Sequence, residues 1–365
     1  MRSLSGIQPS GTLHIGNYFG AMKQFIDIQD SYDGFYFIAD YHALTSFPNP
    51  RDLKKWSIDV VLDYLALGLD PKKSTIFLQS DVPEHVELSW LLANVTPLAL
   101  LERGHSYKDK IAKGIKPNTG LFTYPVLMAA DILIYDADIV PVGKDQKQHL
   151  EMTRDIAIKF NEMYECDVFK LPEPKILESV AVVPGTDGEK MSKSYGNVIN
   201  MFLPEKDLKK QIMNIVSDST PLEEPKNPDN NIMKIYSLFA TKEEIEILKS
   251  KFEAGNYGYG HAKTELFEKI MEHLGCPAVA DVFSMSRSVS NEAHRYEEFI
   301  RFRELENGIL FSEITPKAQI LTCVADHFED RFPLENWIIY DKTHKVCLVH
   351  GVRKRWRLVW GELFN

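Results

Sequence analysis

Hydrophobic and polar positions follow two alternating patterns over residues 1–203. After a short N-terminal run that ends at Leu4, apolar runs typical of buried strands occur at 34–39, 74–79 and 139–142. Stretches with helical spacing lie between and after them, at 15–29, 53–67, 84–92 and 146–160. Strands that alternate with helices in this way form a parallel sheet with helices on both faces. The pattern therefore predicts an α/β, doubly wound parallel sheet.

The pattern changes after residue 203, where helical spacing continues without strands. Amphipathic helices are predicted at 204–216, 231–251 and 261–274, and a linker rich in Pro, Asn and Asp occupies 220–230. We therefore expect a small helical domain over residues 204–276, following a first domain of residues 1–203.

Residues 277–365 return to a mixed pattern. Helices are predicted at 291–305 and 316–328, and strands at 308–314, 337–341, 346–350 and 353–360. The last strand, RKRWRLVW, alternates basic and apolar side chains, so it is either a solvated edge strand, which we favour, or a strand that binds nucleic acid. The tail is predicted to be an atypical α+β extension of unknown role.

Composition narrows the classes of protein to which the chain can belong. Its 365 residues suffice for two domains or more, and its net charge of −10 means that any RNA contact must use a local basic patch. The cysteines Cys166, Cys276, Cys323 and Cys347 are scattered without a CxxC pair, which argues against a metal site or a disulfide scaffold. Neither a secretory leader nor a membrane-spanning stretch is evident. We expect a cytoplasmic protein with no membrane partner.

A loop at residues 190–194 has the sequence KMSKS. Two lysines and two hydroxyls in so short a span form a cationic clamp suited to a triphosphate, on which negative charge builds as pyrophosphate leaves. Glycines precede the motif, as expected of a loop that closes over its ligand. Taken alone, the motif is equally compatible with a solvated loop.

Its partner is the segment SGIQPSGTLHIGN at residues 5–17. Glycines let the backbone approach a nucleotide closely, and the helix that follows directs its N-terminal dipole at anions. His14 adds a side-chain donor at the helix start, beside Gly16 and Asn17. A helix cap is the alternative role for Asn17.

Polar residues also follow the predicted strands. Asp40 and His42 come after the run at 34–39, and Gly143 and Gln146 come after the run at 139–142. Parallel sheets bind ligands at the carboxyl ends of their strands, near the point where the strand order reverses. We therefore expect these loops to form part of the site.

Together, these segments resemble a known family. HIGN at 14–17, followed far downstream by KMSKS, resembles the paired signatures of class I aminoacyl-tRNA synthetases. The runs SGIQPSG, TYPVLMAADIL and VPVGKDQKQH narrow the resemblance to tryptophanyl-tRNA synthetases of bacterial type, over residues 3–274. The resemblance implies a Rossmann-like catalytic domain and an anticodon-binding role for residues 204–276. It also implies activation of L-tryptophan by ATP and its transfer to tRNA(Trp).

The resemblance further implies which residues bind ATP, which enters as its Mg²⁺ complex. The catalytic candidates are His14 and Asn17, which would meet the phosphates, and Lys190 and Lys193, which would grip the β- and γ-phosphates. No protein-bound metal is implied. The full ATP-binding set is Gln8, Pro9, Ser10, Gly16, Asn17, Lys110, Gly143, Lys144, Asp145, Val182, Lys190, Met191, Ser192, Lys193 and Ser194.

Tryptophan selection requires an apolar slot with one acceptor, because the indole N–H can only donate. Asp131 meets this requirement, since it lies in the apolar stretch 126–133, where an unpaired carboxylate is costly. A structural ion pair is the alternative for Asp131, and plain core is the alternative for Met128. The full tryptophan-binding set is Gln8, His42, Tyr124, Met128, Asp131, Val140, Val142 and Gln146.

Two other interpretations stay open. A tyrosine-specific class I synthetase shares both phosphate motifs, although the MAAD and GxDQxxH runs favour tryptophan. A chain that has lost catalysis and acts through its tail, by binding nucleic acid or by regulation, is the second, and the intact motifs argue against it. The tail departs from the family and resembles, more weakly, an uncharacterised domain family associated with DNA metabolism. A homodimer is implied by the resemblance alone.

Overall fold

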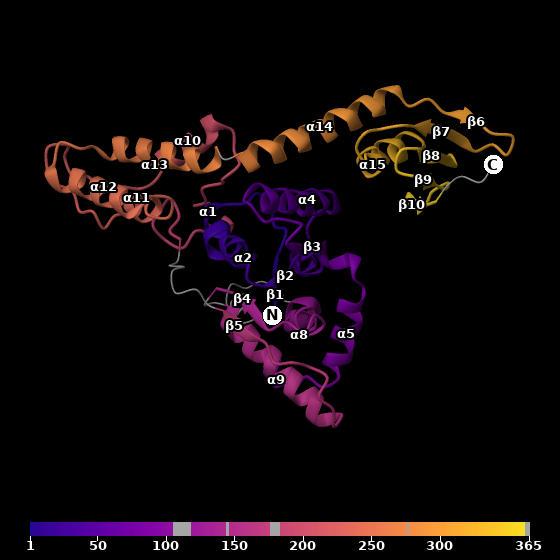
Figure 1. Ribbon diagram of the computed structural model, residues 1–365, viewed down its shortest axis with the longest axis horizontal. Helices are drawn as coiled ribbons and strands as arrows, with labels where there is room; N and C mark the ends of the chain where they lie inside the picture. Colours follow the sequence, from indigo (N-terminus) through magenta and orange to yellow (C-terminus); the bar gives the residue numbers. More distant parts are fainter. Residues whose placement is uncertain (105–117, 144–145, 176–182, 276, 362–365) are drawn as a thin grey trace. The chain divides into compact units, whose positions relative to one another are not determined.

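The computed structural model describes residues 1–104, 118–143, 146–175, 183–275 and 277–361 (Figure 1). The chain divides into two compact units, Met1–Val279 and Ala280–Asn365. None of the helices in the described ranges is both long and apolar enough to cross a membrane.

A five-stranded sheet organises the first unit. Its strands are β1 (Arg2–Ile7), β2 (Asp33–Ile38), β3 (Ser74–Leu78), β4 (Ile139–Pro141) and β5 (Glu173–Lys175). The order is β3-β2-β1-β4-β5, and every neighbouring pair is parallel. The predicted α/β parallel sheet is confirmed. Its order reverses between β1 and β4, where sheets of this kind bind ligands.

Helices cover both faces of this sheet (Figure 1). They are α1 (Ile15–Asn17), a π-helical segment (Tyr18–Met22), α2 (Lys23–Ile28), α3 (Asp40–Ala43), α4 (Pro50–Ala66), α5 (Glu84–Ala93), α6 (Leu98–Leu101), α8 (Thr119–Leu133) and α9 (Lys147–Met163). Tyr36 of β2 packs in one core with Phe25 of α2 and Tyr64 of α4. The next residue, Phe37, packs in another core with Ile132 of α8. This alternation of faces is the two-residue period of a strand buried on both sides.

The sequence pattern missed two parts of the sheet. β1 continues to Ile7 instead of ending at Leu4, and β5 was not predicted. β5 has the sequence EPK, which contains no strand-favouring residue, and a proline is tolerated there because β5 is an edge strand. Strand pairing, and not local preference, sets both segments.

Four further helices belong to the first unit. They are α10 (Glu205–Met213), α11 (Asn231–Tyr236), α12 (Lys242–Ala254) and α13 (Tyr259–Leu274). The single helix predicted at 231–251 is wrong, because Thr241 starts a new helix. Its side chain accepts a hydrogen bond from the Glu244 N–H, and the Glu244 carboxylate accepts one from the Thr241 N–H.

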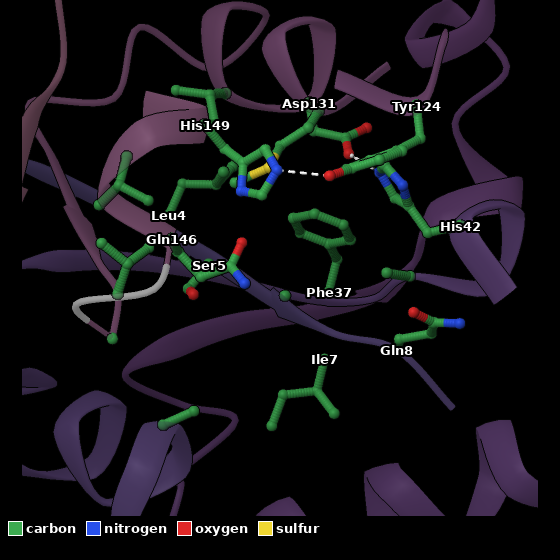
Figure 2. Close-up of a pocket in the computed structure, with 18 of the residues that line it drawn as sticks. Leu4, Ser5, Ile7, Gln8, Phe37, His42, Tyr124, Asp131, Gln146 and His149 are labelled. Carbon is green, nitrogen blue, oxygen red and sulfur yellow. Dashed lines mark hydrogen bonds and ion pairs between the residues drawn. The ribbon is translucent and has the colours of Figure 1, made fainter. Parts of the chain in front are cut away.

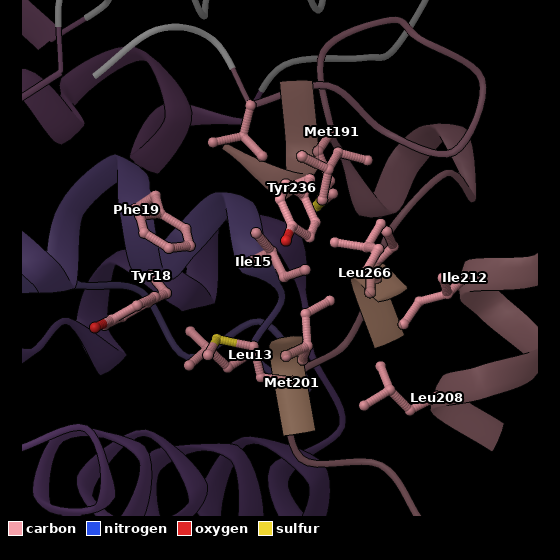
Figure 3. Close-up of a cluster of buried hydrophobic side chains, with 14 of the residues drawn as sticks. Leu13, Ile15, Tyr18, Phe19, Met191, Met201, Leu208, Ile212, Tyr236 and Leu266 are labelled. Carbon is pink, nitrogen blue, oxygen red and sulfur yellow. The ribbon is translucent and has the colours of Figure 1, made fainter. Parts of the chain in front are cut away.

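The helical segment and the N-terminal helix share one hydrophobic core (Figure 3). Ile15 lies in the same cluster as Met201, Leu208 and Leu266. The Ile15 N–H also donates to the Ile199 carbonyl at 3.0 Å. The helical segment is thus tied to the phosphate-motif helix by packing. A domain boundary at residue 203 remains a prediction.

The second unit contains its own five-stranded sheet, with order β10-β9-β8-β7-β6. Its elements are β6 (Arg303–Glu304), β7 (Leu310–Ile314), α15 (Leu321–Arg331), β8 (Trp337–Asp341), β9 (Val346–His350) and β10 (Arg357–Trp360), preceded by α14 (Pro277–Phe299). β7 and β8 are parallel across α15, and the other pairs are antiparallel. The buried side chains of Trp337, Phe328 and Leu348 form its core. The predicted α+β character of the tail is confirmed.

Three predicted elements in the tail have wrong boundaries. The helix predicted at 291–305 begins at Pro277, a residue favoured at the first helical position, and it ends at Phe299 before β6. The helix predicted at 316–328 begins only at Leu321. The strand predicted at 353–360 begins at Arg357, because Arg353 has a φ of 56°, which lies outside the range of a strand.

Candidate active site

A cavity of about 560 Å³ lies at the carboxyl ends of β1 and β4, where the strand order reverses (Figure 2). One part of its wall is formed by the end of β1 and the residue that follows it (4–8). Another part is formed by the end of β4 and the two residues that follow it (140–143). α8 contributes Tyr124, Met128 and Asp131. The site therefore lies where the topology of the sheet predicts it.

Every residue predicted to bind tryptophan lines this cavity. These residues are Gln8, His42, Tyr124, Met128, Asp131, Val140, Val142 and Gln146. They come from the ends of three strands and from α8, segments that are far apart in the sequence. The fold brings the predicted tryptophan-binding set into one cavity of mixed apolar and polar character.

Asp131 is held by three donors although its side chain is only 1 % exposed. Its Oδ1 accepts hydrogen bonds from Gln79 Nε2 at 2.7 Å and from His85 Nδ1 at 2.6 Å. Its Oδ2 accepts one from His42 Nε2 at 2.7 Å (Figure 2). A carboxylate can only accept, so these ring nitrogens carry protons.

These donors determine the charge of the site. Burial alone would raise the pKa of Asp131, but the hydrogen bonds from His42 and His85 outweigh burial and lower it below its ordinary value. The cavity therefore contains a buried negative charge on α8. Burial and the nearby charge of Asp131 in turn raise the pKa of Tyr135 to about 12.

Sequence reasoning missed several residues of this network. Gln79 and His85 are fully buried, and His85 Nε2 lies 2.8 Å from the Tyr135 hydroxyl. Gln79 is fixed in turn, because its Oε1 accepts from the Tyr41 N–H. The one available signal was the position of Gln79 at the carboxyl end of a predicted strand. His149, also missed, is hydrogen-bonded to the Tyr124 hydroxyl (Figure 2).

The two phosphate-binding motifs contact each other. The Gly16 N–H donates to the Met191 sulfur at 3.3 Å, and Lys193 Nζ donates to the Ser10 carbonyl at 3.1 Å. A Cβ on Gly16 would lie 2.9 Å from His14 Nδ1 and 3.4 Å from Met191 Cβ, so a larger residue would crowd the buried His14 ring. Burial lowers the pKa of Lys193, and Asp63 of α4 opposes that shift.

His14 and Asn17 lie at the helix start, as predicted. The His14 N–H donates to Asn17 Oδ1 at 3.3 Å, so Asn17 has a capping contact in addition to lining the cavity. His14 is buried, and burial together with the charge of Lys193 lowers its pKa to about 4. His14 is thus a neutral hydrogen-bonding group at neutral pH.

The other predicted ATP-binding residues divide into three groups. Gln8, Ser10, Asn17 and Gly143 line the cavity. Pro9, Gly16, Lys190, Met191, Ser192, Lys193 and Ser194 are not among its lining residues, although Lys193 reaches Ser10 at its wall. Lys110, Lys144, Asp145 and Val182 lie outside the described residues. Within the ranges described, no three His, Cys, Asp or Glu side chains are grouped as metal ligands would be.

The low pKa of His14 has a direct test. The unfolded chain takes up a proton on this histidine near pH 6.5 and the folded chain only near pH 4. The unfolded state therefore binds more protons between these values, and stability is lost as the pH falls through this window. We expect the His14 ring resonances to titrate near pH 4 by NMR. His14→Gln should lose less unfolding free energy than the wild type between about pH 7 and pH 4.5. A titration midpoint near pH 6.5 would contradict the effect of burial.

Sequence comparison identifies relatives of the first unit. The profile of the family "tRNA synthetases class I (W and Y)" matches residues 1–275. The tryptophan–tRNA ligase of Fusobacterium nucleatum is 74 % identical over 274 residues, which cover 75 % of this chain and 84 % of the relative. The tryptophan–tRNA ligase of Campylobacter jejuni is 56 % identical over 271 residues, which cover 74 % and 85 %.

Structural comparison gives the same family. The crystal structure of Campylobacter jejuni tryptophanyl-tRNA synthetase complexed with ADP and tryptophan is similar with a TM-score of 0.74 at 52 % identity. The similarity covers 80 % of this chain and 91 % of that one. The Mycoplasma pneumoniae enzyme gives a TM-score of 0.65 at 32 % identity, covering 78 % and 88 %.

The tail matches a different profile. Residues 254–365 match a domain of unknown function, DUF4130, so the two profiles overlap across α13. The first profile covers both phosphate motifs and every cavity-lining residue. On these matches, the chain belongs to the class I tRNA synthetases for tryptophan and tyrosine, and within them to the tryptophanyl-tRNA synthetases of bacterial type.

Proposed function

We propose that this protein activates L-tryptophan with ATP and transfers it to tRNA(Trp). The observation that best supports this proposal is that an ionised, buried Asp131 lines the same cavity as Ser10 and Asn17 of the first phosphate motif. The identity of 74 % to a tryptophan–tRNA ligase supports the same substrates. Because protein synthesis consumes the product, the cytoplasm is the expected compartment.

Two displacements make up the reaction. A carboxylate oxygen of tryptophan attacks the α-phosphorus of ATP, and pyrophosphate leaves with the electron pair of the broken P–O bond. A hydroxyl of the terminal ribose of the tRNA then attacks the adenylate carbonyl, and AMP leaves. Neither step needs a covalent enzyme intermediate, so positioning and charge stabilisation can supply the rate.

The ATP side of the site uses the paired motifs. Lys190 and Lys193 neutralise the charge that develops on the leaving pyrophosphate, and Ser192 and Ser194 donate as neutral groups. His14, neutral because of its lowered pKa, donates a hydrogen bond to phosphate without adding charge. Mg²⁺ enters with the nucleotide. Lys110, Lys144, Asp145 and Val182 stay in the ATP-binding set on the family resemblance alone.

The tryptophan side uses the remaining capacity of Asp131. Two donors occupy Oδ1, whereas Oδ2 accepts only from His42 among the described hydrogen bonds. Each carboxylate oxygen offers two acceptor positions, so Oδ2 can also accept the indole N–H. Met128, Val140 and Val142 pack on the ring. Tyr124, Gln146 and Gln8 meet the ammonium and carboxylate groups of the substrate.

Substitution of Asp131 tests this assignment. Asp131→Asn replaces the acceptor and disturbs three donors, so kcat/KM for tryptophan in pyrophosphate exchange should fall about 100-fold, or ~2.7 kcal/mol. The KM for ATP should change far less. As a matched comparison, Lys193→Ala should lower kcat with little change in the KM for tryptophan. Unchanged tryptophan activation in Asp131→Asn, or faster exchange with tyrosine than with tryptophan in the wild type, would refute the assignment.

A homodimer is part of the proposal. Exposed apolar side chains gather on α5 and at the start of α6, where Trp90 is 72 % exposed and Leu98 is 68 % exposed. Val86 and Leu91 on α5 are also exposed. Contiguous exposed apolar surface of this kind marks an interface. α5 packs on α8, which contains Asp131, so the interface would adjoin the tryptophan site.

Trp90→Asp should therefore convert the dimer to a monomer in sedimentation velocity. The matched control is Ile247→Asp on α12, where an apolar side chain of similar exposure stands outside the α5 surface. The control should sediment as the wild type does. A wild-type protein that is monomeric at micromolar concentration would contradict the dimer.

A further inference from the structure

The second unit has a basic strip that the synthetase reaction does not explain. No Asp or Glu occurs from Lys342 to Gly361, and this stretch contains six cationic side chains. These residues are Lys342, Lys345, Arg353, Lys354, Arg355 and Arg357. Acid-free stretches as long as this also occur at 1–26 and 110–130, but they contain only two and three Lys or Arg, so the tail stretch is distinguished by its density of cations in a chain of net charge −10.

The fold brings five of these cations to one edge of the sheet, whereas Lys342 lies at the end of β7, because its N–H donates to the Ile314 carbonyl. β10 is the edge strand, and its register with β9 sets Arg357 opposite Val349 and Trp360 opposite Val346. The Gly361 N–H donates to the Lys345 carbonyl at 3.1 Å, so the β8–β9 turn adjoins the end of β10. Arg353, Lys354 and Arg355 lie at the other end. The cations thus lie at the two ends of β10, which are about 13 Å apart at roughly 3.3 Å per strand residue.

β10 also exposes an aromatic side chain at its end. Trp360 is 66 % exposed, and the neighbouring Val359 is 52 % exposed. Cationic side chains by themselves protect an edge strand against pairing, but an exposed tryptophan does not. Arg355 pairs with Glu329 and Lys342 pairs with Glu313. Lys354 and Arg357 are exposed.

We propose that the β10 edge binds an unpaired stretch of RNA. The cations would track the phosphates and Trp360 would stack on a base, which is how proteins bind single strands without reading sequence. Charge complementarity favours a polyanion, and the proposed aminoacylation reaction brings an RNA to this protein. The choice of RNA over other polyanions rests on that proposed function. The existence of the basic surface does not depend on it.

Fluorescence anisotropy with the full chain and a labelled oligouridine tests the strip. Lys354→Glu/Arg357→Glu should weaken binding at least tenfold. It should also reduce the slope of log K against log salt by about 1.4, as expected for two phosphate contacts. Trp360→Ala should weaken binding about tenfold. The matched control Arg287→Glu/Lys317→Glu makes the same charge change elsewhere in the second unit and should bind as the wild type does.

Pyrophosphate exchange separates this proposal from the proposed function. The strip variants should keep wild-type exchange and wild-type melting temperatures. Binding to oligouridine that is equally weak in the wild type and the strip variants would overturn the RNA surface while leaving tryptophan activation intact. A loss of affinity in the control double variant as large as in the strip variant would overturn it too, because the effect would then reflect overall charge.

A separate observation concerns the network around Asp131. His85 is fully buried and is not among the residues that line the cavity, yet its Nδ1–H donates to Oδ1 of the lining residue Asp131 at 2.6 Å. Its Nε2 lies 2.8 Å from the Tyr135 hydroxyl, so the ring is fixed from both sides. Together with Gln79, it orients the carboxylate with Oδ2 left for a ligand.

We infer that His85 is a positioning residue for selection of the indole N–H, an inference that rests on the proposed tryptophan site. His85→Leu removes the donor, so Asp131 is free to rotate or to take up a proton. 3-Benzothienylalanine is a tryptophan analogue in which sulfur replaces the N–H. The ratio of kcat/KM for tryptophan to kcat/KM for this analogue in pyrophosphate exchange should then fall at least tenfold in the variant. His85→Asn keeps a donor near the Nδ1 position and should retain most of the preference.

The outcomes distinguish a positioning role of His85 from the role of Asp131 itself. A merely structural role for His85 would lower exchange with both amino acids alike in His85→Leu, leaving the preference unchanged, and would overturn the inference. If the wild-type enzyme shows no preference for tryptophan over the sulfur analogue, the role of Asp131 itself is refuted. Equal preferences in His85→Leu and His85→Asn would also overturn the positioning role.

Discussion

A buried negative charge constrains the first unit more than any other group. Asp131 has almost no contact with water, so protein donors must replace its hydration. The three donors come from three places: His42 from α3, Gln79 from the end of β3, and His85 from α5. Tyr135, in the chain after α8, holds the ring of His85 in turn. One carboxylate therefore ties together the elements that form one side of the cavity. A shift of any of them would leave a charge unpaired, so the network keeps the cavity in register with the sheet.

The other side of the site depends on packing. Glycine at position 16 leaves room for His14 and Met191, and the same helix start packs into the core built by α10 and α13. The KMSKS loop thus rests against the HIGN segment while the helical part of the chain supports both. Charge organises the side proposed to bind tryptophan, and close packing organises the side proposed to bind ATP.

The sequence predicts what depends on local pattern or on short motifs. The sheet strands at 34–39 and 74–79 and the tail strands at 337–341 and 346–350 fall within one residue of their predicted bounds. The residues predicted to bind tryptophan all line one cavity. Both outcomes depend on apolar pattern and motif spacing, which are local signals. What it does not predict depends on distant contacts. The partnership of His85 with Asp131 joins residues 46 positions apart, and nothing near His85 marks it as a donor. The break before α12 was missed because a capping box in a continuous helical pattern is a weak signal compared with periodicity.

The position of β1 in the sheet has a consequence for biosynthesis. β1 leaves the ribosome before the other four strands of its sheet, and it becomes the central strand, between β2 and β4. Its pairing with β2 can form early, but the Ser5 side chain meets the Pro141 carbonyl across 136 residues of chain. One side of the central strand must therefore stay uncovered until the whole α5–α8 region has been made. The nascent chain carries a half-finished cavity wall through much of its synthesis, the interval in which an unpaired strand edge is open to mispairing.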